Sequence, residues 1–286
     1  MEWSELRKEV RNLKLQTEAT PTSIASKGAN LIYRVLSEMY VGEPEYLRKI
    51  AYAICQASPH TVALRNVGVA VYRTAAEART GNRMAAAARA AQRLTRLINE
   101  TPKALGRRGQ PLIEDGSTIA TYGFSSAVQE AINHGVNKIS KVVEIQNKPT
   151  SISKIKLEAD APSQFIKIDT SNMLTSDEKI DSFLVGCTAF LADGSMVAEL
   201  GTYKLVELFF ERNINIHFFA DTLKLAPWLP STSSNSSKWD IIPAKFVDHV
   251  ITEDGIRRPP QLLQAAADLA PMWRQFEEGS KSELGK

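Results

Sequence analysis

The chain has 286 residues, of which 43% are hydrophobic and 23% are charged. This composition allows the buried core of one large or two ordinary domains, and it excludes an intrinsically disordered or fibrous protein. The two cysteines, Cys55 and Cys187, have no Cys-x-x-Cys spacing, so neither a disulfide framework nor a zinc site is predicted. No apolar run reaches the roughly 18 residues that a membrane span needs. We therefore expect a soluble, cytoplasmic protein.

Charge is distributed unevenly along the chain. Residues 1–110 hold 18 Lys and Arg against 9 Asp and Glu, whereas the remainder has a net negative charge. Arginines within and just before an Ala-rich stretch recur at helical spacing and predict one basic stripe, formed by Arg79, Arg83, Arg89, Arg93 and Arg96. The stripe is either a solvated helix face or a contact for an anionic partner. RNA is the weaker interpretation, because aromatic side chains that could stack on bases are not interleaved with the arginines.

Residues 1–110 carry helical periodicity throughout and predict an all-helical N-terminal domain. The helices are expected at residues 2–15, 22–39, 43–56 and 82–105, with one more after Pro59. Thr20-Pro21 and Pro44 are typical start signals, because proline fits the first turn of a helix.

Residues 111–286 change to short β-branched runs that alternate with helical patterns, which is typical of βαβ units around a mostly parallel sheet. The fold class is therefore α/β: a helical N-terminal domain followed by a Rossmann-like domain. Strands are predicted at residues 117–122, 138–144, 152–157, 164–168, 182–190 and 215–220. Helices are predicted at residues 126–134 and 203–212 and after Pro260, with a polar loop at residues 231–238.

Open α/β sheets bind ligands where strands end and the next helices begin. Two such places are candidate sites here, one after the first predicted strand and one in the segment between the strand at 182–190 and the following helix. Their residues are Gly123, Phe124, Ser125, Ser126, Thr188, Ala198, Glu199, Gly201 and Thr202. Either serine could equally be a simple helix cap. Backbone amides at both helix starts could hold a phosphate-type anion weakly.

Four segments carry a family resemblance: SPHTVALRN at 58–66, IATYGFSSAV at 119–128, the run from VGCTAF at 185 to LAP at 227, and FVDHVITEDGIRRPP at 246–260. Together they resemble the alpha, beta and delta regulatory subunits of translation initiation factor 2B and two related enzymes. Those enzymes are methylthioribose-1-phosphate isomerase and ribose-1,5-bisphosphate isomerase. The Gly-Phe-Ser run is most similar to the beta subunit, and a beta/delta-like protein of archaeal type is indicated.

The resemblance also shows what this chain lacks. It places Gly123 where the isomerases have a reactive cysteine, Thr188 where they have a catalytic aspartate, and Ala198-Glu199 where they hold the sugar phosphate with Asn-Lys. Glycine and threonine cannot hold or release a proton near neutral pH. Glu199 would also repel a phosphate. No catalytic residue, metal or cofactor is predicted.

The resemblance implies a regulatory subunit of translation initiation that acts by protein–protein contact. Its expected partners are a second copy or related subunits, and translation initiation factor 2. The dimer contact is expected near Val247, Val250 and Ile251. The alternative is a divergent sugar-phosphate isomerase, or a sensor of sugar phosphates or nucleotides, in which Asp221 would be the substitute base. The interval from residue 126 to 185 is short for the family, so a helix is expected to be missing or reduced there.

Overall fold

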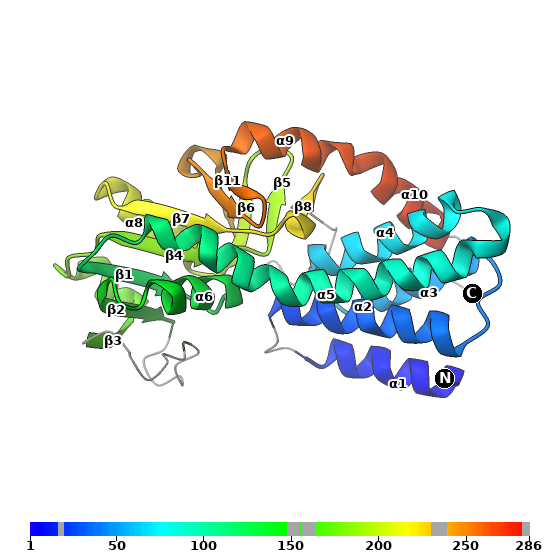
Figure 1. Ribbon diagram of the computed structural model, residues 1–286. Coiled ribbons are helices and arrows are strands. Elements are labelled where there is room, and N and C mark those ends of the chain that lie inside the picture. Colours follow the sequence, from blue (N-terminus) through cyan, green and yellow to red (C-terminus); the bar gives the residue numbers. More distant parts are fainter. Residues whose placement is uncertain (17–19, 148–154, 156–163, 230–238, 282–286) are drawn as a thin grey trace. The chain divides into compact units, whose positions relative to one another are not determined.

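The computed structural model describes residues 1–16, 20–147, 155, 164–229 and 239–281 (Figure 1). It forms two compact units, the first comprising residues 1–100, 223–232 and 265–286 and the second comprising residues 101–222 and 233–264. The predicted division at residue 110 stays a prediction. Residues 223–232 and 265–286 belong to the same unit as the N-terminal helices. The chain therefore passes between the two units more than once.

The first unit is helical, as predicted. Its helices are α1 (Trp3–Lys14), α2 (Pro21–Glu38), α3 (Pro44–Gln56), α4 (Val62–Glu77), most of α5 (Arg83–Gly109), and α10 (Ala270–Lys281). The start signals behave as expected, because the Thr20 side chain accepts a hydrogen bond from Ser23 N at 3.1 Å and Pro21 occupies the first turn of α2. The short 3-10 helix Thr80–Asn82 and the two-residue strand β8 (Leu225–Ala226) also belong to this unit.

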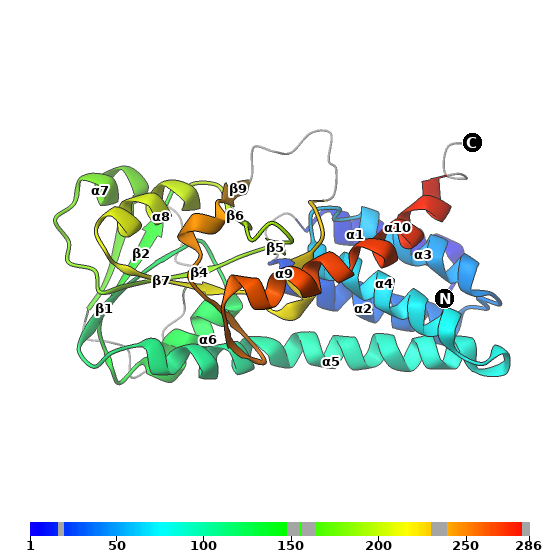
Figure 2. The same ribbon diagram turned by 90° about the horizontal axis from the view of Figure 1, so that it is seen from above.

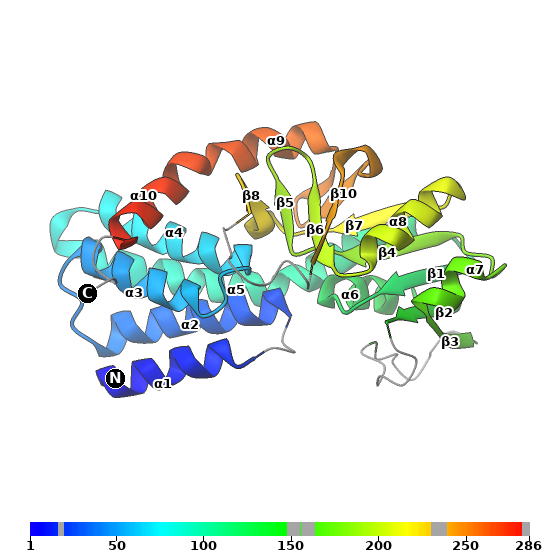
Figure 3. The same cartoon turned by 180° about the vertical axis from the view of Figure 1, so that it is seen from behind.

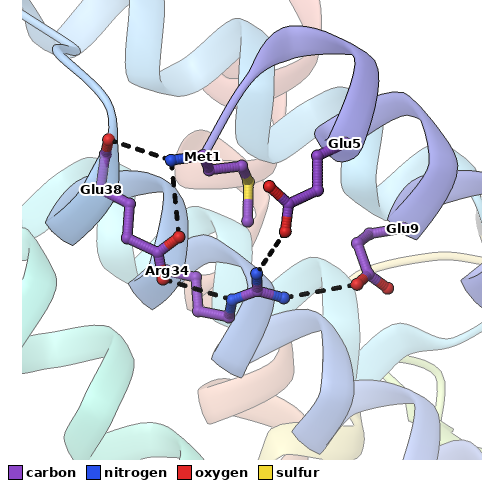
Figure 4. A network of polar contacts seen from close by, with 5 residues as sticks. All are labelled: Met1, Glu5, Glu9, Arg34 and Glu38. Atoms are coloured by element: carbon purple, nitrogen blue, oxygen red, sulfur yellow. Dashed lines mark hydrogen bonds and ion pairs between the residues drawn. The ribbon is translucent and has the colours of Figure 1, made fainter.

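Ion pairs join α1 to α2 (Figure 4). The Arg34 guanidinium lies 2.8 Å from Glu5, 3.4 Å from Glu9 and 3.4 Å from Glu38. The backbone amine of Met1 also contacts Glu38. The hydrogen bond that Arg34 donates to the Glu5 carboxylate is the main cause that raises the pKa of Arg34. A single cation thus holds carboxylates of both helices together.

A buried polar cluster explains part of the 58–66 motif. Asn66 donates hydrogen bonds to the carbonyls of Leu223 and Leu225 at 2.7 and 2.8 Å, and its own carbonyl accepts from Trp273 Nε1 at 2.7 Å. The neighbouring Arg65 pairs with Glu277. Asn66 and Arg65 therefore connect α4 to α10, and Asn66 also connects α4 to the segment around β8. Their role is structural.

The second unit is a doubly wound α/β domain around a seven-stranded sheet of order β11-β10-β7-β4-β1-β2-β3. All described pairings are parallel except that of β10 with β11. The strands are β1 (Ser117–Tyr122), β2 (Ile139–Gln146), β3 (Gln164–Asp169), β4 (Ser182–Gly186), β7 (Asn215–Phe219), β10 (Val250–Thr252) and β11 (Gly255–Arg257). Figure 2 shows α6 (Ser126–Gly135) on one face and α7 (Thr170–Thr175) and α8 (Thr202–Glu211) on the other. The Rossmann-like expectation is confirmed.

The predicted strand at 182–190 was wrong as a single element. The chain leaves the sheet at Gly186, and β5 (Ala189–Leu191) belongs to a second, antiparallel sheet with β6 (Met196–Glu199) and β9 (Trp239–Ile242). Figure 3 shows β5 and β6 side by side. The break was missed because an apolar run does not reveal where a strand changes sheets.

Short elements account for the other differences. β6, β9, β10 and β11 have three or four residues each and α7 has six, too few to show a clear period. The predicted strand at 152–157 lies outside the described residues apart from Ile155, which is not in a strand. The remaining short elements are the 3-10 helices Gln110–Leu112, Thr222–Lys224 and Ala244–Phe246 and the helix α9 (Pro259–Asp268).

Candidate functional site

The end of β1 is the first candidate place, and the chain order of the sheet puts it at a topological switch point. From β1 the chain moves outward through α6 to β2, whereas β4 pairs with β1 on its other side. Such a divergence creates the crevice in which open α/β sheets bind ligands. Residues 123–126 leave β1 here, as the sequence predicted.

Gly123 and Glu199 lie in contact at this switch point. The backbone of Gly123 has φ of +68°, a left-handed conformation that favours glycine. A Cβ atom at this position would come within 3.0 Å of the Glu199 carboxylate oxygen Oε2. The Glu199 side chain thus fills the space where any other residue 123 would begin its side chain. The replacements at positions 123 and 199 are therefore coupled, because the two residues pack against each other.

Ser125 is a helix cap and also fills space at the end of β4. Its hydroxyl accepts a hydrogen bond from Val128 N at 3.4 Å at the start of α6. A Cβ atom on Gly186 would overlap Ser125, so that glycine is required by the contact. Within the described part of the chain, no carboxylate, imidazole or thiol is hydrogen-bonded to the Ser125 hydroxyl. Phe124 and Ser126 are half-buried beside it.

Cys187 and Thr188 follow β4 and are both buried. The thiol of Cys187 lies 3.3 Å from the carbonyl oxygen of Phe219, and Thr188 N donates to Val197 O at 2.7 Å. Thr188 therefore serves as the link between the two sheets rather than presenting an acidic group. Ala198, in β6, is fully buried.

Asp240 accepts hydrogen bonds from the backbone amides at the start of α8. The sequence did not predict this contact. Its Oδ2 atom accepts hydrogen bonds from Gly201 N and Tyr203 N, both at 2.8 Å. Gly201, with φ of +102°, precedes the helix without a cap of its own. The Thr202 hydroxyl donates to Glu199 O at 2.6 Å. A carboxylate of the chain itself therefore sits where a small anion was expected.

Two further side chains are hydrogen-bonded to the turn between β6 and α8. Tyr122 donates from its hydroxyl to Leu200 O at 2.5 Å, and Asn147 donates to the same carbonyl at 3.3 Å. Burial, together with the negative charge of Glu199, raises the pKa of Tyr122. The phenol stays protonated at neutral pH and acts as a hydrogen-bond donor.

Asp221, the suggested substitute base, lies just after β7 and is buried. Nearby, the backbone amide of Thr222 donates to both carboxylate oxygens of Glu253 at 3.1 Å. Burial raises the pKa of Glu253, and the Asp221 carboxylate adds to that rise while hydrogen bonds from Thr222 oppose it. The two acids thus lie near each other at the ends of β7 and β10, a pairing that sequence reasoning missed.

The residues expected at a dimer contact require a correction. Val247, Val250 and Ile251 are at most 4% exposed, and the last two belong to β10 inside the seven-stranded sheet. Their apolar character is explained by the chain's own core, so they cannot form a contact surface themselves. Ile256, in the edge strand β11, is 46% exposed and lies within the same segment.

Parallel strands also bring two histidines together that the sequence showed as unrelated. His217 in β7 and His249 just before β10 share a hydrogen bond of 2.9 Å between Nδ1 and Nε2. Burial, and secondly the neighbouring His249, lowers the pKa of His217 to about 4. Burial also lowers the pKa of His249, which Asp248 opposes.

Other ligand classes find little support in the part of the chain that the structure describes. There, no group of three or more His, Cys, Asp or Glu side chains could hold a metal ion. The helices of that part are all too short or too polar to cross a membrane. In the basic stripe, Arg83 lies 3.6 Å from Glu43, while Arg89, Arg93 and Arg96 are exposed.

A helical unit and a doubly wound α/β unit with a topological switch point at β1 define the class of the protein. The model of the initiation factor 2 subunit family matches residues 24–238, about three quarters of the chain. The chain therefore belongs to that family, as the resemblance in its sequence indicated.

Its relatives carry two kinds of name. A putative translation initiation factor eIF-2B subunit 2-like protein of Pyrococcus abyssi is 26% identical over 89% of this chain and 97% of its own length. A putative methylthioribose-1-phosphate isomerase of Methanocaldococcus jannaschii is 29% identical, but over 57% of this chain and 52% of its own length. Among solved structures, the tetrameric eIF2B-beta2-delta2 complex from C. thermophilum contains a similar chain. That chain has a TM-score of 0.80 at 15% identity, covering 93% of this chain and 94% of its own, which shows the shared fold.

Proposed function

We propose that this protein is a non-catalytic regulatory subunit of the translation initiation factor 2B type, which acts by binding other proteins. The packing of Glu199 against Gly123 is the observation that carries the proposal. In the related isomerases the resemblance puts a cysteine at the first position and a lysine at the second. Here the carboxylate takes the place of a side chain at 123, so neither a nucleophile nor a phosphate-binding cation is supplied.

The surroundings of this pair support the same conclusion. Acid–base catalysis needs a group within hydrogen-bond reach of the substrate that exchanges protons near neutral pH. Ser125 has a helix amide as its partner, Thr188 has no titrating group, and the pKa of Tyr122 is raised further from neutrality. A phosphate would also meet Glu199 and Asp240 in place of a cation.

A divergent isomerase is the second candidate, favoured by the relatives that bear isomerase names. The pair Asp221 and Glu253 would be its acid and base, because burial raises the pKa of Glu253 toward neutrality. Replacing each of them separately distinguishes the candidates. In the regulatory account Glu253→Gln alters stability alone, whereas in the isomerase account it abolishes turnover.

The expected partners are a second copy or related regulatory subunits, and translation initiation factor 2, in the cytoplasm. Support comes from the full-length match to the subunit-like protein and from the fold shared with a subunit of a tetrameric complex. Affinity capture of the intact chain from native extract, followed by mass spectrometry, tests this proposal. Recovery of initiation factor 2 or a related subunit is the expected result. Capture of metabolic enzymes alone would contradict it.

The structure also sharpens the expectation of weak phosphate binding. The backbone amides of Gly201 and Tyr203 at the start of α8 are already hydrogen-bonded to Asp240, and the Ser125 hydroxyl accepts from Val128 N in the first turn of α6. We expect AMP, GDP and ribose 5-phosphate to bind no tighter than about a millimolar dissociation constant. Micromolar binding by calorimetry would instead indicate a metabolite sensor.

A further inference from the structure

A hollow in the α/β unit lies beside β10, β11 and the start of α9, and it is not lined by the candidate residues at the strand ends. Its volume is about 560 Å³, and its walls are formed by Leu112, His249, Ile256, Arg258, Pro260 and Gln261. That volume falls within the roughly 300–1,000 Å³ of small-molecule sites. The hollow is therefore large enough for a small organic ligand.

The walls combine an apolar surface with few polar groups. Leu112, Ile256 and Pro260 are apolar, and Ile256 is 46% exposed there. Among the described residues, no carboxylate lies within ion-pair distance of the Arg258 guanidinium. Gln261 accepts a hydrogen bond from the Arg258 backbone amide at 2.8 Å, which fixes the turn carrying the guanidinium. An apolar platform next to an unpaired guanidinium suits a ligand with an apolar body and an acidic group.

The histidine pair contributes a polar group without a fixed charge. His249 lines the hollow and is hydrogen-bonded at 2.9 Å to His217, which is 5% exposed. Because burial keeps both imidazoles neutral at pH 7, the formal charge on the lining is that of Arg258 alone. One positive charge is enough to pair with a single carboxylate, and the apolar walls offer no further hydrogen-bond donors for the other oxygens of a phosphate.

We propose that this hollow is a binding site for a small organic monoanion, whose carboxylate pairs with Arg258 and whose apolar body packs on Leu112, Ile256 and Pro260. The site is separate from the degenerate pocket at the strand ends and does not depend on the proposed regulatory function. A bound carboxylate would favour the protonated form of the histidine pair, so binding takes up protons as the pH falls below neutral. The charged groups near the pair are Asp248, which is adjacent to His249, and Arg258, which lines the same hollow.

Benzoate is a suitable probe, because it joins one carboxylate to an apolar ring. The intact protein is titrated with benzoate, benzyl alcohol and inorganic phosphate while the His249 ring resonances are followed by NMR. We expect benzoate to shift these resonances with a dissociation constant on the order of a millimolar. Benzyl alcohol lacks the charge and phosphate lacks the apolar body, so both should bind at least about tenfold more weakly.

Two adjacent arginines give a matched pair of variants. Arg258→Gln should weaken benzoate binding about tenfold or more, since it removes a charge-assisted hydrogen bond. Arg257→Gln, at the neighbouring position in β11, should leave it unchanged. The proposal is overturned if Arg258→Gln binds benzoate as tightly as the wild type, if Arg257→Gln weakens binding equally, or if millimolar benzoate leaves the His249 resonances unmoved. Equal binding of phosphate and benzoate would also overturn it.

Discussion

Replacing Gly123 by alanine tests whether Glu199 fills the space at the end of β1. The left-handed backbone at Gly123 should disfavour any residue with a Cβ atom by about 1–2 kcal/mol. The new methyl group would also push the Glu199 side chain out of its rotamer, at about 0.5–1.5 kcal/mol. We therefore expect Gly123→Ala to lower the free energy of unfolding by about 1.5–3.5 kcal/mol.

Gly116 provides the control for this prediction. Its φ is +77°, close to that of Gly123, but a Cβ atom there would meet nothing within 4 Å. Gly116→Ala should therefore show the backbone effect alone, about 1–2 kcal/mol by urea denaturation. The excess at Gly123 should disappear when Glu199→Ala is combined with Gly123→Ala in a double-mutant cycle. Equal effects at both glycines, or an excess that survives removal of Glu199, would show that Glu199 does not fill the space beside Gly123.

Three further predictions concern charges. Asp240→Asn should lower the free energy of unfolding by about 1–2 kcal/mol, because it weakens the hydrogen bonds that cap Gly201 N and Tyr203 N. Hydrogen exchange at these amides should become faster, and unchanged exchange would argue against the capping role. Burial lowers the pKa of His217 to about 4, against 6.5 in the unfolded chain, so the stability that depends on the neutral imidazole is fully present above about pH 6.5. Up to about 3 kcal/mol of it should be lost as the pH falls toward 4. His217→Asn should flatten this part of the plot of unfolding free energy against pH, and an unaltered plot would contradict the prediction. Arg34→Gln should speed exchange in α1 but leave α3 unchanged, whereas equal changes in both helices would contradict a local role.

Local signals explain why the helices and central strands were predictable. Thr20 and Pro21 start α2 through contacts within three residues, and Ser125 caps α6 in the same way. The strand β1 coincides with a run of residues that includes Thr118, Ile119 and Thr121, and such β-branched residues predict a strand without knowledge of its partners. Such features depend on neighbours in the chain, so the sequence displays them directly.

The site depended on contacts that spacing does not reveal. Asp240 contacts Gly201 from 39 residues further along the chain, and His217 is hydrogen-bonded to His249 across two parallel strands. The family resemblance singled out Gly123 and Glu199 as separate losses, but their shared space became visible in three dimensions alone. For the same reason, apolar residues near 250 suggested a surface contact although the chain's own sheet buries them.

The proposed regulatory function predicts that this protein does not catalyse isomerisation of sugar phosphates. The most direct measurement is turnover of ribose 1,5-bisphosphate and methylthioribose 1-phosphate by the purified protein, with a related isomerase as positive control. We expect no turnover above the rate without protein, because Gly123, Thr188 and Glu199 supply neither a proton-transfer group nor a cation that could hold the phosphate. A rate above about 1 per second on either substrate, within the range of ordinary enzymes, would contradict it.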